Sequence, residues 1–240
     1  MPLLPIEDVD QLVATRGSWH TLAERVLAPA RHAATGRIGL RPTPGGVGTP
    51  PFGEEQTELR IEHTDLVVAS RGRTRRAPIT TLGAAAALAG TAPEAETGVY
   101  APTTSPDPDA TLPVDTASAA ILAEWFSFAA ALLDEWRAER TARDARDAPV
   151  APQLWPEHFD LALDAGRDGH RANYGASPGD ASDPEPYLYV GPWNPLEGNY
   201  WTHGTYAALP YSALLEAPDP LTLGLDHFRT GRRLVDETPD

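Results

Sequence analysis

His158 and Asp160 stand two residues apart in a stretch, 153–164, that we expect to form one strand with an edge or bulge at Pro156. Side chains two positions apart on a strand point to the same face. The imidazole and the carboxylate would then lie side by side, with His158 as general base or acid and Asp160 orienting it. This pair is the candidate catalytic group of the sequence.

Aromatic residues on a second expected strand, 185–193, extend the same face. Alternation sends Leu188 and Val190 to one side, which fits a core, and tyrosine and tryptophan to the other. A face that combines rings with a few polar groups is typical of a small-molecule site. A second packed layer, in which the tyrosines simply cover other elements, is the alternative. The candidate ligand-binding residues are Trp155, Tyr187, Tyr189, Trp193 and Arg41, and Arg41 or Arg171 can hold a carboxylate.

The same histidine and aspartate can also serve as metal ligands. His203 is the nearest downstream histidine, and His158, Asp160 and His203 would complete a two-histidine, one-carboxylate site for a divalent metal. That ligand set resembles the site of non-haem iron oxygenases in three residue types only. The chain before His158 lacks the strand pattern of their barrel. No cofactor beyond this possible divalent metal is indicated.

Three further motifs favour structural roles. Gly175-Ala176-Ser177-Pro178-Gly179 matches the nucleophile elbow of hydrolases, but the prolines that follow forbid the required helix. The glycines of 45–48 lack the lysine and the helix of a phosphate loop, so we expect a loop that needs positive φ. The arginines of 71–76 suit a solvated hairpin tip better than an anion site.

The composition excludes several classes of protein. The chain has 240 residues with no cysteine, and all 19 of its basic residues are arginine. Disulfides, thiolate catalysis, cysteine zinc sites and lysine Schiff bases are therefore excluded. A net charge of −15 opposes binding to nucleic-acid backbones and anionic membranes. The N-terminus lacks a secretory signal pattern and no stretch reaches ~18 apolar residues, so we expect a cytoplasmic protein.

The pattern of elements predicts an α+β fold, with two antiparallel β-meanders packed with helices. One meander lies within 57–79, and the other comprises 153–164, 170–176 and 185–193. A long amphipathic helix is expected at about 116–140, capped by Asp115 or Thr116. Shorter helices are expected after Ser18, after Thr80 or Thr81, at 206–216 and, capped by Asp219, at 221–235.

The proline-rich segment 91–114 is the expected linker or mobile loop between an N-terminal half, 1–90, and a C-terminal half, 115–240. The two halves can also form one continuous domain. Three functions fit the sequence: a small-molecule-binding protein, a metal-dependent or His–Asp acid/base enzyme, and an interaction or structural protein. The sequence does not indicate an oligomeric state.

Overall fold

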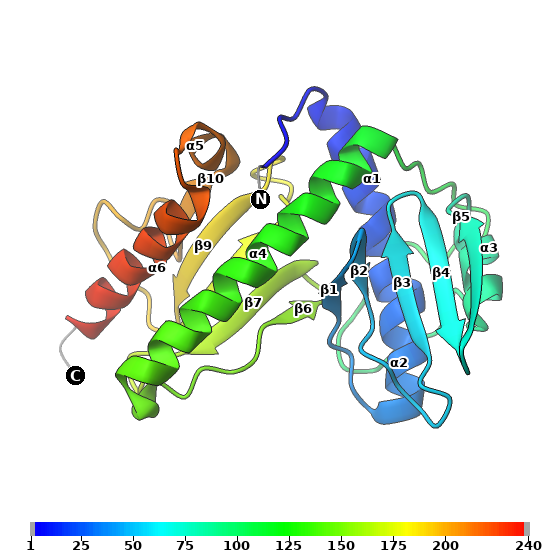
Figure 1. The fold of residues 1–240 in the computed structure, drawn as a ribbon, viewed down its shortest axis with the longest axis horizontal. Coiled ribbons are helices and arrows are strands. Elements are labelled where there is room, and N and C mark those ends of the chain that lie inside the picture. The colour runs from blue at the N-terminus through cyan, green and yellow to red at the C-terminus, as the bar shows by residue number, and fades with distance from the viewer. Residues whose placement is uncertain (1–2, 238–240) are drawn as a thin grey trace. The chain divides into compact units, whose positions relative to one another are not determined.

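The computed structural model describes residues 3–237 and has the predicted α+β class (Figure 1). Its contacts divide the chain into two compact units. The N-terminal unit comprises 5–127 and 154–159; the C-terminal unit comprises 3–4, 128–153 and 160–237. The expected segment 91–114 belongs to the N-terminal unit, and the domain boundaries themselves stay a prediction.

The helical layer of the N-terminal unit is longer than the sequence suggested. α1 (Val9–Leu22) passes through a π-helical turn, η1 (Ala23–Leu27), into α2 (Ala28–Thr35). Asp8 caps α1, whereas Ser18, the expected cap, lies inside it. The Ser18 hydroxyl instead donates to the carbonyl of Ala14, one turn earlier in the helix, and to the carbonyl of Pro113.

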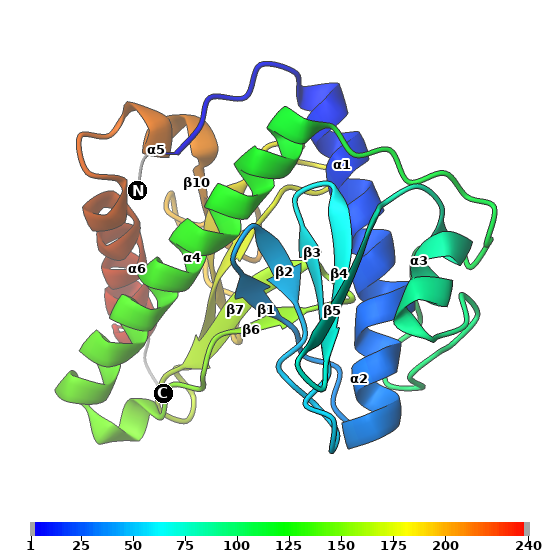
Figure 2. The same cartoon turned by 45° about the vertical axis from the view of Figure 1, so that its right-hand side comes forward.

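An antiparallel meander packs against these helices, as Figure 2 shows. Its strands are β1 (Arg41–Thr43), β2 (Gly46–Gly48), β3 (Glu58–Glu62), β4 (Asp65–Ser70) and β5 (Arg73–Pro78), in sequence order across the sheet. The expected glycine loop at 45–48 forms the turn and second strand of the β1–β2 hairpin, and the turn places Gly45 at φ +78°. α3 (Leu82–Ala89) follows, capped by Thr81 and ended by Gly90.

Two buried charges of the π-helical turn hold the segment 91–114. Glu24 is fully buried, and its carboxylate accepts hydrogen bonds from the backbone N–H groups of Thr103 and Thr104 at 2.9–3.1 Å. Arg25, also buried, donates to the Thr104 carbonyl. π-helical turns project side chains that a regular helix would place elsewhere. In this turn the side chains of Glu24 and Arg25 both bind residues 103–104 of the proline-rich segment.

Replacing Glu24 by alanine leaves two backbone donors without their acceptor. We expect Glu24→Ala to lower the free energy of unfolding by about 3 kcal/mol and to expose 91–114 to proteases. Glu96→Ala is the control, since the Glu96 side chain is 64% exposed and lies 4.0 Å from Arg25. Glu96→Ala should lower the free energy of unfolding, measured by urea denaturation, by less than about 0.5 kcal/mol. Equal stability of the two variants would contradict the conclusion that Glu24 holds the segment 91–114.

The predicted long helix is present as α4 (Thr116–Arg143), and Asp115 caps it through a 2.7 Å bond from the Ser118 N–H. By length and composition α4 is apolar enough to cross a membrane, but 61% of its most apolar stretch is buried in the structure. A buried core helix passes the same test. The short 3-10 turn η2 (Ala145–Asp147) follows it.

The second antiparallel sheet has the order β10-β9-β8-β7-β6. Its strands are β6 (Gln153–Trp155), β7 (Asp160–Ala165), β8 (Ala172–Ser177), β9 (Tyr187–Pro192) and β10 (Ala207–Pro210). The expected single strand 153–164 is broken, because Pro156 begins a turn in which Phe159 adopts φ +54°. The expected helix 206–216 is β10 followed by α5 (Tyr211–Glu216).

One face of this sheet packs on α6 (Pro220–Asp236), which Asp219 caps as expected. Leu188 and Val190 of β9 are fully buried there. Gly224 and Gly231 of α6 leave room for these two side chains, since a Cβ at either glycine would lie within 2.9 Å of a side-chain atom of β9. The rings of Trp136, Tyr174 and Phe228 meet at 5.0–5.8 Å on the same face. The opposite face therefore carries every second residue of β7, β8 and β9.

Candidate functional site: a tyrosine face on the C-terminal sheet

The residues expected to form one site fall into both units. Asp160, Tyr187, Tyr189, Trp193 and His203 belong to the C-terminal unit. Arg41, Trp155 and His158 belong to the N-terminal unit. Within the C-terminal unit, Asp160, Tyr187 and Tyr189 are close to one another, and His203 pairs with Asp183 beside them.

Ala162, Gly175 and Tyr189 lie opposite one another across β7, β8 and β9, on the face opposite α6, and Asp160 lies two residues before Ala162 on the same face. The Tyr189 hydroxyl donates a hydrogen bond to Oδ2 of Asp160, which is buried. The ring reaches that far because it lies over Gly175: a Cβ there would stand 2.5 Å from the ring carbon Cε1 and the hydroxyl oxygen. Tyrosine, glycine and aspartate thus act as one unit across three strands.

Tyr187 is anchored in the same way by another carboxylate. Its hydroxyl donates to Oδ2 of Asp180 at 2.7 Å. The other oxygen of Asp180 accepts the backbone N–H groups of Ser182 and Asp183, so the turn after β8 fixes the carboxylate. Burial, and then the aspartates, raise the pKa values of Tyr187 and Tyr189 well above the usual range of tyrosine. Both phenols therefore stay protonated donors at physiological pH.

A third ring, Tyr206, completes the group. It lies parallel to Tyr187 at 6.0 Å and edge-on to Tyr189 at 6.1 Å, and the first two rings are 6.3 Å apart. Tyr189 and Tyr206 are only partly buried. We call Asp160, Gly175, Tyr187, Tyr189 and Tyr206 the tyrosine face. Its Tyr187 ring is buried and its Tyr189 and Tyr206 rings are partly exposed, and carboxylates hold the hydroxyl groups of Tyr187 and Tyr189.

His203 lies beside this face and pairs with a carboxylate. Its ring stacks on Tyr206 at 5.0 Å, and Nε2 is 3.1 Å from Oδ2 of Asp183. Its other nitrogen, Nδ1, is 3.0 Å from the Thr202 hydroxyl. Both ring nitrogens are engaged, so His203 orients Tyr206 and carries no nitrogen ready to take a substrate proton.

Trp193 lies outside the tyrosine face. It follows β9, is 59% exposed, and its ring covers the guanidinium of Arg171 at 5.5 Å. Arg171 in turn binds Asp164 through two nitrogens, so this arginine is already paired. Trp193 thus makes a cation–π contact with Arg171, the residue before β8.

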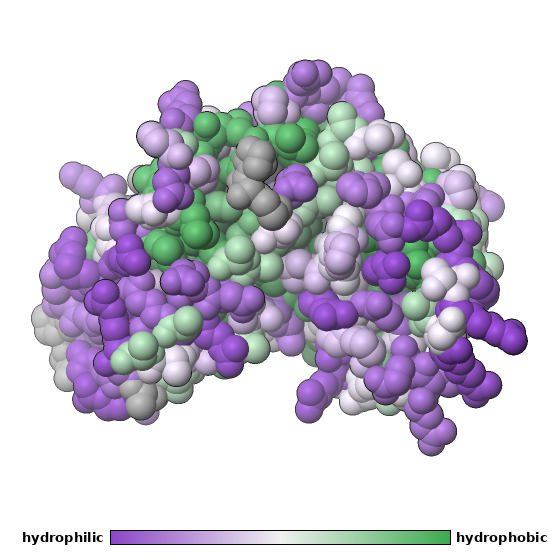
Figure 3. All heavy atoms as spheres, viewed as in Figure 1, coloured by the Kyte–Doolittle hydropathy of each residue, from purple (hydrophilic) through white to green (hydrophobic). Residues whose placement is uncertain are grey.

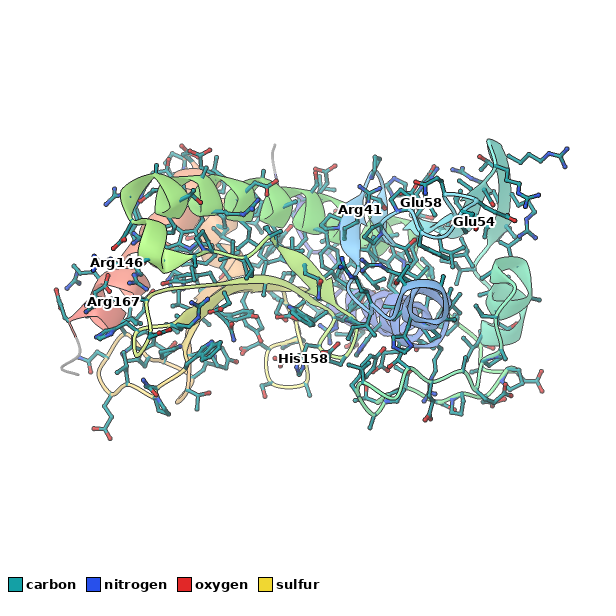
Figure 4. The ribbon with its side chains drawn as sticks, turned by 90° about the horizontal axis from the view of Figure 1, so that it is seen from below. Arg41, Glu54, Glu58, Arg146, His158 and Arg167 are labelled. Carbon is teal, nitrogen blue, oxygen red and sulfur yellow. The ribbon has the colours of Figure 1, made fainter. Side chains whose placement is uncertain are left out.

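The remaining expected residues lie in the N-terminal unit. His158, labelled in Figure 4, is exposed on the turn after β6, and Trp155 is 38% exposed. Phe159 of the same turn is buried and stacks on His20 at 5.3 Å. His20 also bonds the Pro156 carbonyl at 2.9 Å, and burial lowers its pKa. The strained Phe159 backbone is therefore held by ring packing.

Arg41 lies on the solvent side of the N-terminal sheet, where Figure 4 shows it next to Glu58, 2.7 Å away. Hydrophilic side chains gather over this sheet in Figure 3. With Arg60, Glu62 and His63 these residues line an open depression of about 500 Å³. Arg41 and Arg60 are already paired with glutamates there. Both guanidinium groups would have to leave a glutamate before they could bind a ligand carboxylate.

No group of three or more histidine, aspartate or glutamate residues that could hold a metal ion occurs within residues 3–237. The metal site expected from His158, Asp160 and His203 takes its residues from both units and stays a prediction. Ser177 of the hydrolase-like motif is buried, and its hydroxyl accepts the Gly179 N–H at 3.1 Å. The segment after it leads to β9, in agreement with the expected glycine–proline loop.

Sequence reasoning missed Gly175, Asp180, Asp183 and Tyr206 as members of this region. A signal for Gly175 existed, since an isolated glycine inside a strand often marks a close approach by another group. Asp180 follows a Ser-Pro-Gly turn, where a side chain that accepts backbone N–H bonds is typical. Tyr206 begins the expected helix 206–216 but lies just before β10 in the structure, and its position beside Tyr187 and Tyr189 depends on tertiary contacts.

Gly175 offers a direct test of this geometry. Gly175→Ala forces the Tyr189 ring off β8 and breaks its bond to Asp160, so the free energy of unfolding should fall by about 1–3 kcal/mol. Gly191→Ala is the matched control on the same face, because a Cβ there meets nothing closer than 3.8 Å. Urea denaturation of both variants measures the difference. Equal costs would show that Tyr189 does not lie over Gly175.

His227 of α6 gives this unit a defined pH dependence. Burial lowers the pKa of His227 to about 4, from the usual 6.5. The unfolded chain takes up its proton at a higher pH than the folded chain does. The stability that His227 confers is therefore full above pH 6.5 and is lost as the pH falls towards 4, by up to about 1.4 kcal/mol per pH unit. His227→Gln should remove that part of the slope in denaturation between pH 7 and 4, and an unchanged slope would contradict its burial.

Comparison of the chain with models of protein families, with curated proteins and with solved structures finds no match in any of the three. The function must therefore be argued from the tyrosine face itself.

Proposed function

We propose that this protein binds a small organic molecule on the tyrosine face and performs no covalent chemistry of its own. The observation that carries the proposal is the set of three tyrosine rings within 6.0–6.3 Å of one another, on the sheet face opposite α6. Aromatic rings with a few fixed polar groups are the usual lining of small-molecule sites.

The fixed positions of the rings support binding. Tyr187 and Tyr189 are held at their hydroxyl ends by Asp180 and Asp160, and both stand on adjacent positions of one strand face. Side chains on a strand that are also tied by hydrogen bonds lose little entropy when a ligand arrives. The arrangement is pre-organised for recognition.

Catalysis by the nearby groups is less well supported. The phenols stay protonated, and the His203 imidazole is held at both nitrogens. A general base needs a free nitrogen or oxygen within reach of the substrate proton. The pairing of His158 with Asp160, with or without a metal, remains a separate prediction, and it places its two residues in different units.

A ligand-observed NMR screen of small metabolites tests the proposal. We expect hits with the parent protein and their loss, by about tenfold or more in affinity, with Tyr206→Leu. Trp193→Leu is the matched control, because it removes a more exposed ring of the same unit outside the tyrosine face. Hits that are lost with Trp193→Leu and kept with Tyr206→Leu would overturn the assignment, as would no hits at all.

A further inference from the structure

We propose that the outer edge of β5 is a docking site for an extended, acidic segment of another protein, which adds to the N-terminal sheet as a further strand. This interaction is independent of the tyrosine face, which belongs to the other unit. Two features of β5 support it: the backbone groups that the strand directs away from the sheet, and the arginines beside them.

β5 is the last strand of the N-terminal sheet, whose order is β1-β2-β3-β4-β5 (Figure 1). It pairs with β4 along its whole length, and five of its six residues are exposed. Among residues 3–237, no backbone hydrogen bond from another segment reaches the other edge of β5. An edge of this kind is a template for one more strand.

The residues just after β5 show which backbone groups point outward. The Ile79 N–H donates to the turn before β4, whereas the Thr80 carbonyl accepts the Leu112 N–H on the other side. Because these directions alternate along an antiparallel strand, Thr74 and Arg76 direct their N–H and C=O groups away from β4. The chain thus covers its own edge beside Thr80 and leaves it open along β5.

Arginines lie on both faces of this open edge. Of the arginines expected at a hairpin tip, Arg71 lies in the turn and the other three lie on β5. Arg73 and Arg75 share one face of the strand. Among residues 3–237 neither forms an ion pair, although the chain has a net charge of −15, whereas Arg71 and Arg76 pair with glutamates. Arg73 and Arg75 are therefore available to carboxylates from outside the chain.

An acidic strand fits both features. Its backbone would bond to Thr74 and Arg76, and its side chains opposite Arg73 and Arg75 would lie on the same face as these arginines. Acidic residues at every second position would each meet one guanidinium. Strand addition takes its affinity from the backbone and its specificity from alternate side chains. A nucleic acid would be repelled by the net charge and would use none of the backbone groups.

Two labelled heptapeptides separate charge from backbone pairing. One alternates glutamate with threonine, and the other has glutamine in place of each glutamate. We expect fluorescence anisotropy to show at least about tenfold tighter binding of the acidic peptide, weakened by rising salt. The acidic peptide should also slow hydrogen exchange at the Thr74 and Arg76 amides by about tenfold or more. The Arg75 amide, which faces β4, is the internal control and should not change.

The matched variants replace exposed arginines by glutamine. Arg73→Gln combined with Arg75→Gln should lower the affinity for the acidic peptide about tenfold and leave that for the glutamine peptide unchanged. Arg37→Gln combined with Arg137→Gln is the control, because it changes the net charge equally at exposed arginines outside β5. The control should bind both peptides as the parent does.

Each contrary result overturns a stated part of the proposal. No binding of the acidic peptide, equal affinity for the two peptides, or unchanged affinity in the Arg73 and Arg75 variant would overturn the acidic partner. Binding without protection of the Thr74 and Arg76 amides would overturn strand addition. A single-stranded oligonucleotide that binds β5 as tightly as the acidic peptide would show a general anion surface and overturn the protein partner.

Discussion

The hydrogen bond from Tyr189 to Asp160 is the interaction on which the tyrosine face depends. It joins β9 to β7 across β8, and it is possible only because Gly175 leaves room for the ring between them. A buried carboxylate is costly without a donor, and a buried phenol is costly without an acceptor. Each group therefore stabilises the other.

The two faces of the C-terminal sheet differ in the side chains that they carry. The face towards α6 is apolar, and glycines of α6 allow close packing against Leu188 and Val190. The opposite face uses small residues and tyrosines, and it satisfies its polar atoms with aspartates from a neighbouring strand and a turn. A face that is only solvated does not need a buried carboxylate, such as that of Asp160, to accept an aromatic hydroxyl group.

Much of this fold follows from local sequence rules. The period-two pattern of β3 and β4, the caps at Thr81, Asp115 and Asp219, and the apolar stripe of α4 predict their elements correctly. The pairing of Tyr189 with Asp160 on one face also follows from alternation. What failed depends on tertiary contacts: the turn at Phe159 is held by His20, and the expected helix 206–216 contains a strand because β10 pairs with β9. The positions of Asp180 and Asp183 also depend on tertiary contacts and do not follow from the local sequence.

The most direct test of this account is the hydroxyl proton of Tyr189, observed by NMR. A phenol proton held by a buried carboxylate exchanges slowly and resonates far downfield of free hydroxyl protons. We predict such a signal in the parent protein and in Tyr187→Phe, and its loss in Tyr189→Phe. A spectrum without that signal, or one in which it survives in Tyr189→Phe, would contradict the central interaction and the tyrosine face built on it.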